Sequence, residues 1–349
     1  MSQSNCRRSL VCIIATAMLP LFTVSGAHAG DHKISGCTII TEAGNYLLTA
    51  DIIVDQTCPN PDILDPDVGY VGIQIAASDV HLNLGGHTIY GDPAGYGDGF
   101  ARGIDTPGAD VQVNVSITNG RVDGMGAIGD GIYIQSVKHL SITNVESTGN
   151  GRFGMGLVFC EACTVTGSMF RDNFNAGVQT VFAGDADGDG VSDGPLRMVG
   201  NEFTGSAVSN GITIGFFGGA HEIIGNTISN NGFNGVGEFF NPEGGNLFRG
   251  NTIEANGFAG LRLCTDSNTI QANKVLDNGG NGIEIVGGFP CRFGPPDLGG
   301  ADNLIRANRS VGNVGVDAFD VNAACVNTWK ANTFENDSEG DGPKAGCIR

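Results

Sequence analysis

The sequence is short of positive charge. Its 349 residues contain 18 Lys and Arg against 37 Asp and Glu, which gives a formal net charge of −19. The basic residues are also scattered along the chain rather than gathered into one segment. Because a surface this acidic repels a phosphate backbone, the composition argues against a nucleic-acid-binding protein.

Helical patterns are missing too. No stretch offers ten residues with apolar side chains at helical spacing, and the 57 glycines recur too often for helix interiors. Apolar and polar residues instead alternate over runs of three to five positions, a period that is typical of short β-strands. These features predict an all-β protein.

A run long enough to cross a membrane is absent as well. Near the start, two arginines precede an apolar run that Pro20 interrupts, and the small-residue pattern Ala27-His28-Ala29 follows it. This order is typical of a cleavable secretory signal. We therefore expect residues 1–29 to be removed and the protein to be secreted or periplasmic, without a membrane span.

Cysteine use agrees with export. Eight of the ten cysteines lie outside the signal, and this even number suits disulfides in an oxidising compartment. A zinc site at Cys160 and Cys163 would need two further ligands nearby, and none stands out. The simplest pairing joins sequence neighbours: Cys37 with Cys58, Cys160 with Cys163, Cys264 with Cys291, and Cys325 with Cys347.

The most informative signal is an internal repeat. A glycine followed by an aliphatic residue recurs every 22 to 34 positions, and most units also contain an Asn-centred turn such as GNTI. The short strands of one unit cannot bury their apolar sides alone, but stacked as coils of a solenoid they can. The sequence thus predicts a right-handed parallel β-helix of about ten coils. The repeat glycines are Gly72, Gly103, Gly131, Gly154, Gly177, Gly211, Gly235, Gly260, Gly282 and Gly315.

Known proteins share these patterns. The segments GCTIITEAGNYLLTADIIV and LNLGGHTI, together with the GIxI and GNTI coils, resemble the right-handed parallel β-helix repeat proteins of the pectate-lyase-like superfamily. The resemblance covers about residues 34–335. It implies the fold but leaves the activity open, because that superfamily contains polysaccharide lyases, glycoside hydrolases, sugar epimerases, periplasmic copper-site maturation proteins and non-catalytic surface modules.

The expected domain organisation follows from the repeat. We expect a signal peptide at 1–29, an N-terminal strand and cap at 30–71, the parallel β-helix at 72–335, and a C-terminal tail or cap at 336–349. Caps are expected because an uncovered solenoid end exposes a sheet edge. The turn asparagines are expected to stack as a hydrogen-bonded ladder of Asn226, Asn251, Asn273, Asn308 and Asn332.

A candidate site lies on the first strand of each coil, where the residue after the first aliphatic one points outward. Insertions at 92–102, 182–195 and 289–302 border these strands and are expected to wall a groove that suits a polymer chain. The resemblance implies a substrate cleft on the same sheet. The expected outward residues are Gln74, Asp105, Tyr133, Gly156, Gln179, Thr213, Gly237, Arg262, Glu284 and Asp317.

Three consecutive outward residues, Arg262, Glu284 and Asp317, are the catalytic candidates. An arginine beside two carboxylates would separate their pKa values and supply the acid and the base that sugar chemistry uses. The alternative is that these residues form only a solvated surface with an ordinary ion pair. The candidate substrate-binding residues are Tyr133, Gln179, Glu238 and Asp320.

The segment GDADGDGVSDG predicts a calcium site. Its oxygen ligands would be Asp185, Asp187, Asp189 and Asp193, together with the backbone carbonyl of Val191. The final bidentate acid of an EF-hand is missing, because Leu196 holds that position. The alternative is a solvated acidic loop.

The expected function is that of a polysaccharide-directed β-helix protein, either a polysaccharide lyase or a glycoside hydrolase. Its partner would be a polysaccharide or cell-surface glycan. A second hypothesis is a non-catalytic glycan-binding or structural surface module. A weaker third one is periplasmic metal delivery, which the resemblance and His81 and His87 suggest.

Overall fold

The computed structural model describes ten segments of the chain. It divides the chain into two units, Met1–Gly30 and Asp31–Arg349, and every described residue belongs to the second unit. The predicted signal peptide and all five calcium ligands lie outside the described residues. The described residues are 31–59, 68–92, 100–108, 110–184, 194–215, 219–239, 244–287, 300–322, 325–339 and 346–348.

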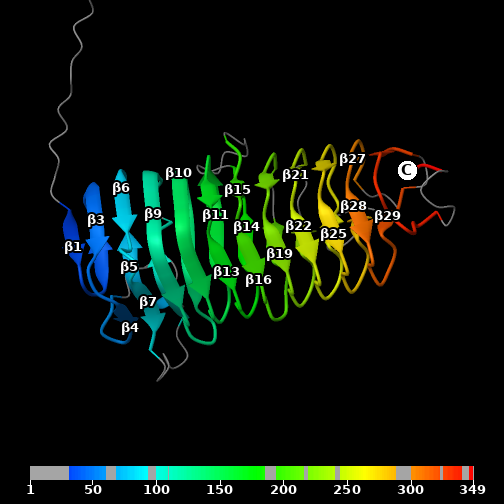
Figure 1. Cartoon of the computed structure of the whole chain (residues 1–349). Coiled ribbons are helices and arrows are strands. Elements are labelled where there is room, and N and C mark those ends of the chain that lie inside the picture. Colours follow the sequence, from blue (N-terminus) through cyan, green and yellow to red (C-terminus); the bar gives the residue numbers. More distant parts are fainter. Residues whose placement is uncertain are drawn as a thin grey trace, which may run out of the picture. The chain divides into compact units, whose positions relative to one another are not determined.

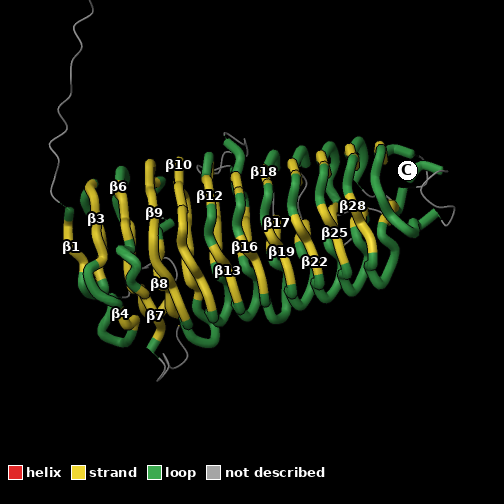
Figure 2. Tube along the Cα trace, in the orientation of Figure 1, coloured by secondary structure: helices red, strands yellow, loops and turns green. Residues whose placement is uncertain are grey.

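Thirty strands and no helix make up the described part of the chain, and all of its strand pairings are parallel (Figure 1). Each strand pairs with the equivalent strand of the next coil, so three parallel sheets run along the solenoid (Figure 2). This arrangement confirms the predicted right-handed parallel β-helix.

The bounds of the strands follow by sheet. The first sheet contains β2 (Thr38–Ile40), β5 (Val68–Ile75), β8 (Phe100–Asp105), the start of β10 (Asp130–Thr148), β11 (Met155–Glu161), β14 (Val178–Val181), β17 (Ile212–Gly215), β20 (Val236–Phe239), β23 (Leu261–Leu263), β26 (Ile283–Ile285) and β29 (Ala318–Asp320). The second contains β1 (His32–Ile34), β3 (Gly44–Leu48), β6 (Val80–Asn83), β9 (Gln112–Asp123), the middle of β10, β12 (Thr164–Thr166), β15 (Arg197–Val199), β18 (Glu222–Ile224), β21 (Leu247–Arg249), β24 (Thr269–Gln271), β27 (Leu304–Arg306) and β30 (Thr328–Lys330). The third contains β4 (Ile52–Val54), β7 (Thr88–Gly91), the ends of β9 and β10, β13 (Met169–Arg171), β16 (Glu202–Thr204), β19 (Thr227–Ser229), β22 (Thr252–Glu254), β25 (Lys274–Leu276) and β28 (Arg309–Val311).

The core is filled by columns of aligned aliphatic side chains. In the first sheet, the residue after each repeat glycine from Gly72 to Gly282 points inward and is buried, as Ile104 and Leu261 show. Phe170 and Phe203 stack in the third sheet with ring centroids 5.3 Å apart. Because each strand is only three to five residues long in most coils, stability comes from these inter-coil contacts rather than from any single coil.

Stacked asparagines form hydrogen bonds with the buried backbone groups of the turns and with one another. In the predicted ladder, each asparagine from Asn226 on donates from Nδ2 to Oδ1 of the next one, as far as Asn332, over 3.0 to 3.1 Å. Asn201, which precedes the predicted set, donates to Asn226 in the same way. A second ladder joins Asn231, Asn256, Asn278 and Asn313. The first ladder confirms the prediction, and the second extends it.

Disulfides fasten the ends and the middle of the solenoid. The predicted pairs Cys37–Cys58, Cys160–Cys163 and Cys325–Cys347 are present, which leaves no thiolates there for zinc. Cys264 is also disulfide-bonded, and its predicted partner, Cys291, lies outside the described residues.

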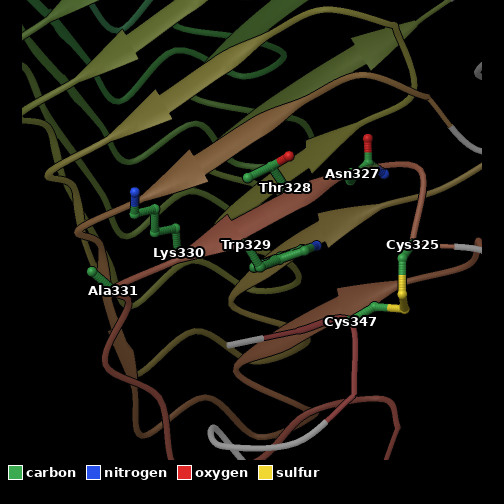
Figure 3. Close-up of a pocket in the computed structure, with 7 residues that line it drawn as sticks. All are labelled: Cys325, Asn327, Thr328, Trp329, Lys330, Ala331 and Cys347. Atoms are coloured by element: carbon green, nitrogen blue, oxygen red, sulfur yellow. A yellow bond between two sulfur atoms is a disulfide. The ribbon is translucent and has the colours of Figure 1, made fainter.

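The C-terminal end is covered by the tail. Ile348 is fully buried against the core, and Phe334 is nearly so. A pocket of about 450 Å³ lies beside β30 at this end (Figure 3). It is lined by Cys325, Asn327, Thr328, Trp329, Lys330, Ala331 and Cys347.

Candidate functional site

The outward positions of the first sheet form one continuous row, which we call the first-sheet ladder. Its residues pair coil to coil without a gap, so the backbones of successive residues lie about 5 Å apart. The prediction is correct for nine of the ten positions. The ladder consists of Gln74, Asp105, Tyr133, Gly156, Gln179, Thr213, Gly237, Arg262, Glu284 and Phe319.

Arg262 and Glu284 meet on this ladder as predicted. Arg262 Nη1 lies 3.2 Å from one carboxylate oxygen of Glu284 and 3.3 Å from the other. The Glu284 side chain is only 11% exposed, and its burial raises the pKa of the carboxyl, although the Arg262 charge and a hydrogen bond from Asn281 oppose that rise. A raised pKa makes this carboxylate a stronger base than an ordinary glutamate.

Asp317 does not join this pair, and its predicted place on the ladder is wrong. Glu284 pairs with Phe319, because Asp317 occupies the repeat-glycine position of its coil beside Gly282. The Asp317 carboxylate is buried, and it accepts hydrogen bonds from the amide of Asn313 and the backbone N–H of Glu335. It therefore ends the second asparagine ladder.

Glu238 also lies away from the ladder surface. It pairs with the inward-facing Ile214, and its side chain points into the coil. Its carboxylate accepts hydrogen bonds from Asn246, the backbone of Cys264, and the backbone and hydroxyl of Thr265. Burial raises the pKa of Glu238, and these donors oppose that rise.

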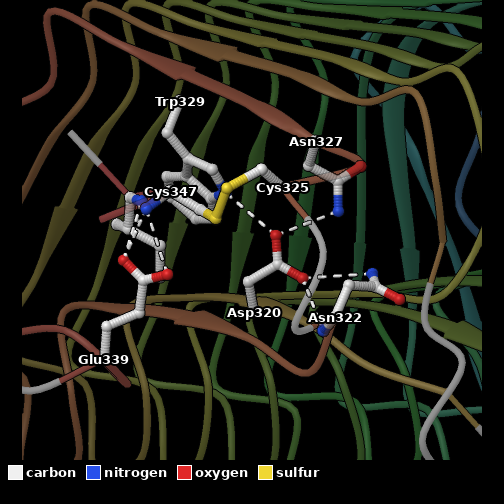
Figure 4. The surroundings of a disulfide bond; sticks show 8 residues. Asp320, Asn322, Cys325, Asn327, Trp329, Glu339 and Cys347 are labelled. Carbon is white, nitrogen blue, oxygen red and sulfur yellow. Dashed lines mark hydrogen bonds between the residues drawn. A yellow bond between two sulfur atoms is a disulfide. The ribbon is translucent and has the colours of Figure 1, made fainter.

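Asp320 has a similar internal position near the C-terminal end (Figure 4). Its carboxylate accepts hydrogen bonds from Asn322, Asn327 and the indole N–H of Trp329. Glu238 and Asp320 thus organise turns, and neither faces a ligand on the ladder.

An arginine–aspartate cluster occupies the other end of the ladder. Arg102 donates to Asp105 over 2.9 Å and lies 3.9 Å from Asp130, while Arg152 binds the same Asp130 carboxylate. Gln74 donates to Asp105 from the preceding coil. Sequence reasoning missed this cluster, since it considered only the residue after each aliphatic position. The available signal was a charged residue directly before two successive repeat glycines, namely Arg102 and Asp130.

Tyr133 links this cluster to the middle of the ladder. The Arg102 guanidinium lies 3.9 Å from the centroid of its ring. The ring also lies over Gly156, where a Cβ atom would come within 2.6 Å of a ring carbon. Glycine at 156 therefore lets the ring lie flat along the ladder, and burial raises the pKa of its hydroxyl.

The middle of the ladder is uncharged and polar. Gln179 and Thr213 pair there and are partly exposed. Asn210 donates to the Thr213 hydroxyl and lies over Gly237. The insertions predicted to wall a groove lie mostly outside the described residues.

The residues considered for metals are dispersed in the described part of the chain. His81 contacts Ser116 over 2.8 Å, whereas His87 contacts Asp51 over 3.2 Å. Among the described residues, no three His, Cys, Asp or Glu side chains are grouped as a metal site would require. The described residues also contain no helix long and apolar enough to span a membrane.

Comparison with known proteins defines the class. A family model described as right-handed beta helix region matches residues 186–294. Together with the strand register, this match identifies a right-handed parallel β-helix with the pectate-lyase-like fold. None of the curated protein sequences compared with the chain matches it.

Several solved structures share this fold. The mannuronan C-5 epimerase AlgE4 A-module of Azotobacter vinelandii superposes with a TM-score of 0.53 at 14% identity, covering 87% of this chain and 84% of that one. The AlgE6 A-module of the same organism gives 0.50 at 14% identity, with coverages of 88% and 84%. The Dettilon tailspike protein gives 0.57 at 16% identity, covering 91% of this chain and 61% of that one. At such identities the likeness concerns the fold.

Proposed function

We propose that this protein is polysaccharide-directed and holds a glycan chain along the first-sheet ladder. The observation that carries the proposal is the composition of the ladder between Tyr133 and Glu284. An aromatic ring and arginines stand near its ends, and hydrogen-bonding side chains without charge lie between them. Sugars are bound by such mixtures of flat apolar groups and convergent polar ones. The structural neighbours include two mannuronan C-5 epimerase modules, which supports a glycan as the ligand.

As its activity we propose a polysaccharide lyase acting at Arg262 and Glu284. A two-carboxylate hydrolase needs a second carboxylate facing the first across the sugar, and Asp317 is turned into the asparagine ladder instead. A lyase needs a cation to neutralise the sugar carboxylate and a base to take the neighbouring proton. The C–O bond to the leaving sugar then breaks as a C=C bond forms, and the leaving oxygen gains a proton. Arg262 and Glu284 match these requirements in kind.

The second candidate is a non-catalytic glycan-binding module. The observation that favours it is that Arg262 and Glu284 already satisfy each other. Export is part of both proposals, and the disulfides support an oxidising compartment. Calcium at residues 185–193 is proposed as a structural ion in both cases.

A panel of soluble polymers tests these proposals. The panel contains alginate, polygalacturonate, xylan and galactomannan, with binding followed by calorimetry and products by reducing-end release and the ultraviolet absorbance of unsaturated uronates. Absorbing products that disappear in Glu284→Gln support the lyase. Reducing ends without that absorbance point to a hydrolase, and binding without turnover points to the module. Binding to none of the polymers rejects the ladder as a glycan site.

A matched control comes from the third sheet. Arg171 and Glu202 form an equivalent inter-coil ion pair, with 2.9 Å between Nη2 and Oε2. Glu202→Gln removes the same charge from a surface away from the ladder. It is expected to leave binding and turnover unchanged.

A further inference from the structure

A stripe of exposed apolar side chains runs beside the first-sheet ladder. Its members lie in the turns that lead into first-sheet strands of neighbouring coils, and they are between 39% and 80% exposed. Gly280 and Gly315 hold this place in the last two coils, and Val314 lies one residue before Gly315. We call this row the turn stripe, and it consists of Phe174, Val208, Phe233, Phe258 and Val314.

The backbone holds the turn stripe in place. The N–H of Phe258 donates to the carbonyl of Phe233 over 2.9 Å, and the N–H of Val208 donates to Phe174 over 3.1 Å. The rings of Phe233 and Phe258 have centroids 4.5 Å apart, and their planes are inclined to each other by 41°. At Gly257, a Cβ would come within 2.4 Å of the carbonyl oxygen of Gly232, so the turns are tightly stacked. The rings are therefore fixed at the spacing of the coils.

The shape of the stripe restricts what can bind to it. It is one side chain wide, and it extends over about five coil steps, or roughly 24 Å. A stable protein interface needs about 800 Å² and 20 or more residues on each side, which one row of five side chains cannot supply. The flanking turn segments NNGFNG (230–235) and ANGFAG (255–260) carry no charge. A narrow, extended ligand with apolar faces fits this surface.

We infer that the turn stripe is a stacking platform for the sugar rings of the polysaccharide that the ladder binds. This inference rests on the proposed function and adds a second row of residues that contacts the glycan. Pyranose rings have apolar C–H faces and polar edges, and aromatic faces bind the former. A sugar ring that lies over Phe233 and Phe258 directs its hydroxyl edge toward the ladder residues of the same coils, Gly237 and Arg262. The platform recognises ring faces rather than sugar charge.

Paired substitutions test the platform. Because both rings are exposed, Phe233→Ser with Phe258→Ser should fold normally. The double variant should bind the polymer selected from the panel about tenfold more weakly. Ile53→Ser is the matched control, because Ile53 is a 47% exposed apolar residue on the third sheet, and its affinity should equal that of the wild type.

A fluorescent variant provides a second readout. Phe258→Trp keeps an aromatic platform, and the other tryptophan, Trp329, is 4% exposed. The polymer should bind this variant at least as tightly as the wild type and should change its emission. If the double variant binds the polymer as tightly as the wild type and the emission of Phe258→Trp does not change on binding, the turn stripe is not a platform. Binding at the ladder would be unaffected by that result. Binding of no polymer by the wild type overturns both proposals. A wild-type dimer that the double variant converts to a monomer assigns the stripe to contact between copies and also overturns the inference.

Discussion

Arg262 and Glu284 lie one coil apart on the same face, with Arg262 Nη1 3.2 Å from Glu284 Oε1. Burial raises the pKa of Glu284, and the positive charge of Arg262 limits that rise. Removing the charge in Arg262→Gln should therefore raise the pKa of Glu284 further. Glu284 then takes up its proton at a higher pH. Any activity that needs its carboxylate therefore begins to fall at a higher pH as the solution is made more acidic. The carboxyl ¹³C titration of Glu284 measures this directly, and a downward shift would contradict it.

Asp317 provides a test of the corrected register. Asp317→Ala leaves the amide of Asn313 and the backbone N–H of Glu335 without their acceptor. We expect a loss of about 2 to 3 kcal/mol in the free energy of unfolding and no change in glycan affinity. Denaturant unfolding and calorimetry on the selected polymer measure the two effects. Glu42→Ala, at an exposed acid, should change neither, and a weaker glycan affinity in Asp317→Ala would return this residue to the site.

The strand repeat was predictable because each coil repeats the same local chemistry. A Gly-aliphatic start and an Asn turn recur in most units, and parallel stacking follows from the need to bury both sides of each coil. The asparagine ladder followed from the same regularity, whereas the three described disulfides followed from pairing cysteines that are neighbours in the sequence. The last coil breaks it, because Asp317 takes the glycine position and a two-residue shift puts Phe319 on the ladder.

The orientation of acidic side chains was harder to predict. Glu238, Asp317 and Asp320 look like site residues by residue type, yet all three accept hydrogen bonds from buried amides. A stack of amides leaves donors at its end, and a carboxylate is a strong acceptor for them. The arginine–aspartate cluster was missed because residues that precede the repeat glycines were not considered. Its arginines, Arg102 and Arg152, also converge on Asp130 from different coils.

The asparagine ladder should stabilise the fold through its buried members. Asn251→Ala removes the side-chain donor to the carbonyl of Ile223 and the acceptor of the backbone N–H of Asn226, and should cost about 3 kcal/mol. The control is the exposed pair in which Asn144 donates to Asn119 over 3.0 Å. Asn144→Gly suits its φ of 55° and should cost only about 0.5 kcal/mol. Equal losses in urea unfolding would show that burial does not set the contribution.

Calcium should raise the melting temperature if residues 185–193 bind it. Asp187→Ala with Asp189→Ala removes two of the proposed carboxylate ligands, so the calcium-dependent shift should vanish. Differential scanning calorimetry of chelator-treated protein, with and without added calcium, measures the shift. Glu202→Gln with Glu222→Gln removes two negative charges elsewhere and should preserve it. A shift that survives in the aspartate variant would place the ion at another site.

His221 should make the fold sensitive to acid. Its ring is buried, neither ring nitrogen has a hydrogen-bond partner in the described structure, and burial lowers the pKa to about 4 from 6.5. The unfolded chain then binds the proton more readily than the folded one, so stability present above about pH 6.5 is lost as the pH falls toward 4.

The full loss contributed by His221 amounts to about 3 kcal/mol. Because His221 occupies the turn position that Asn246 holds one coil later, His221→Asn should fold and should lose this part of the acid sensitivity. Urea unfolding at about pH 7 and pH 4.5 measures the difference. His139→Asn, at an exposed histidine, should behave like the wild type. An identical pH dependence in His221→Asn and in the wild type would mean that the ring gains a partner when it is protonated.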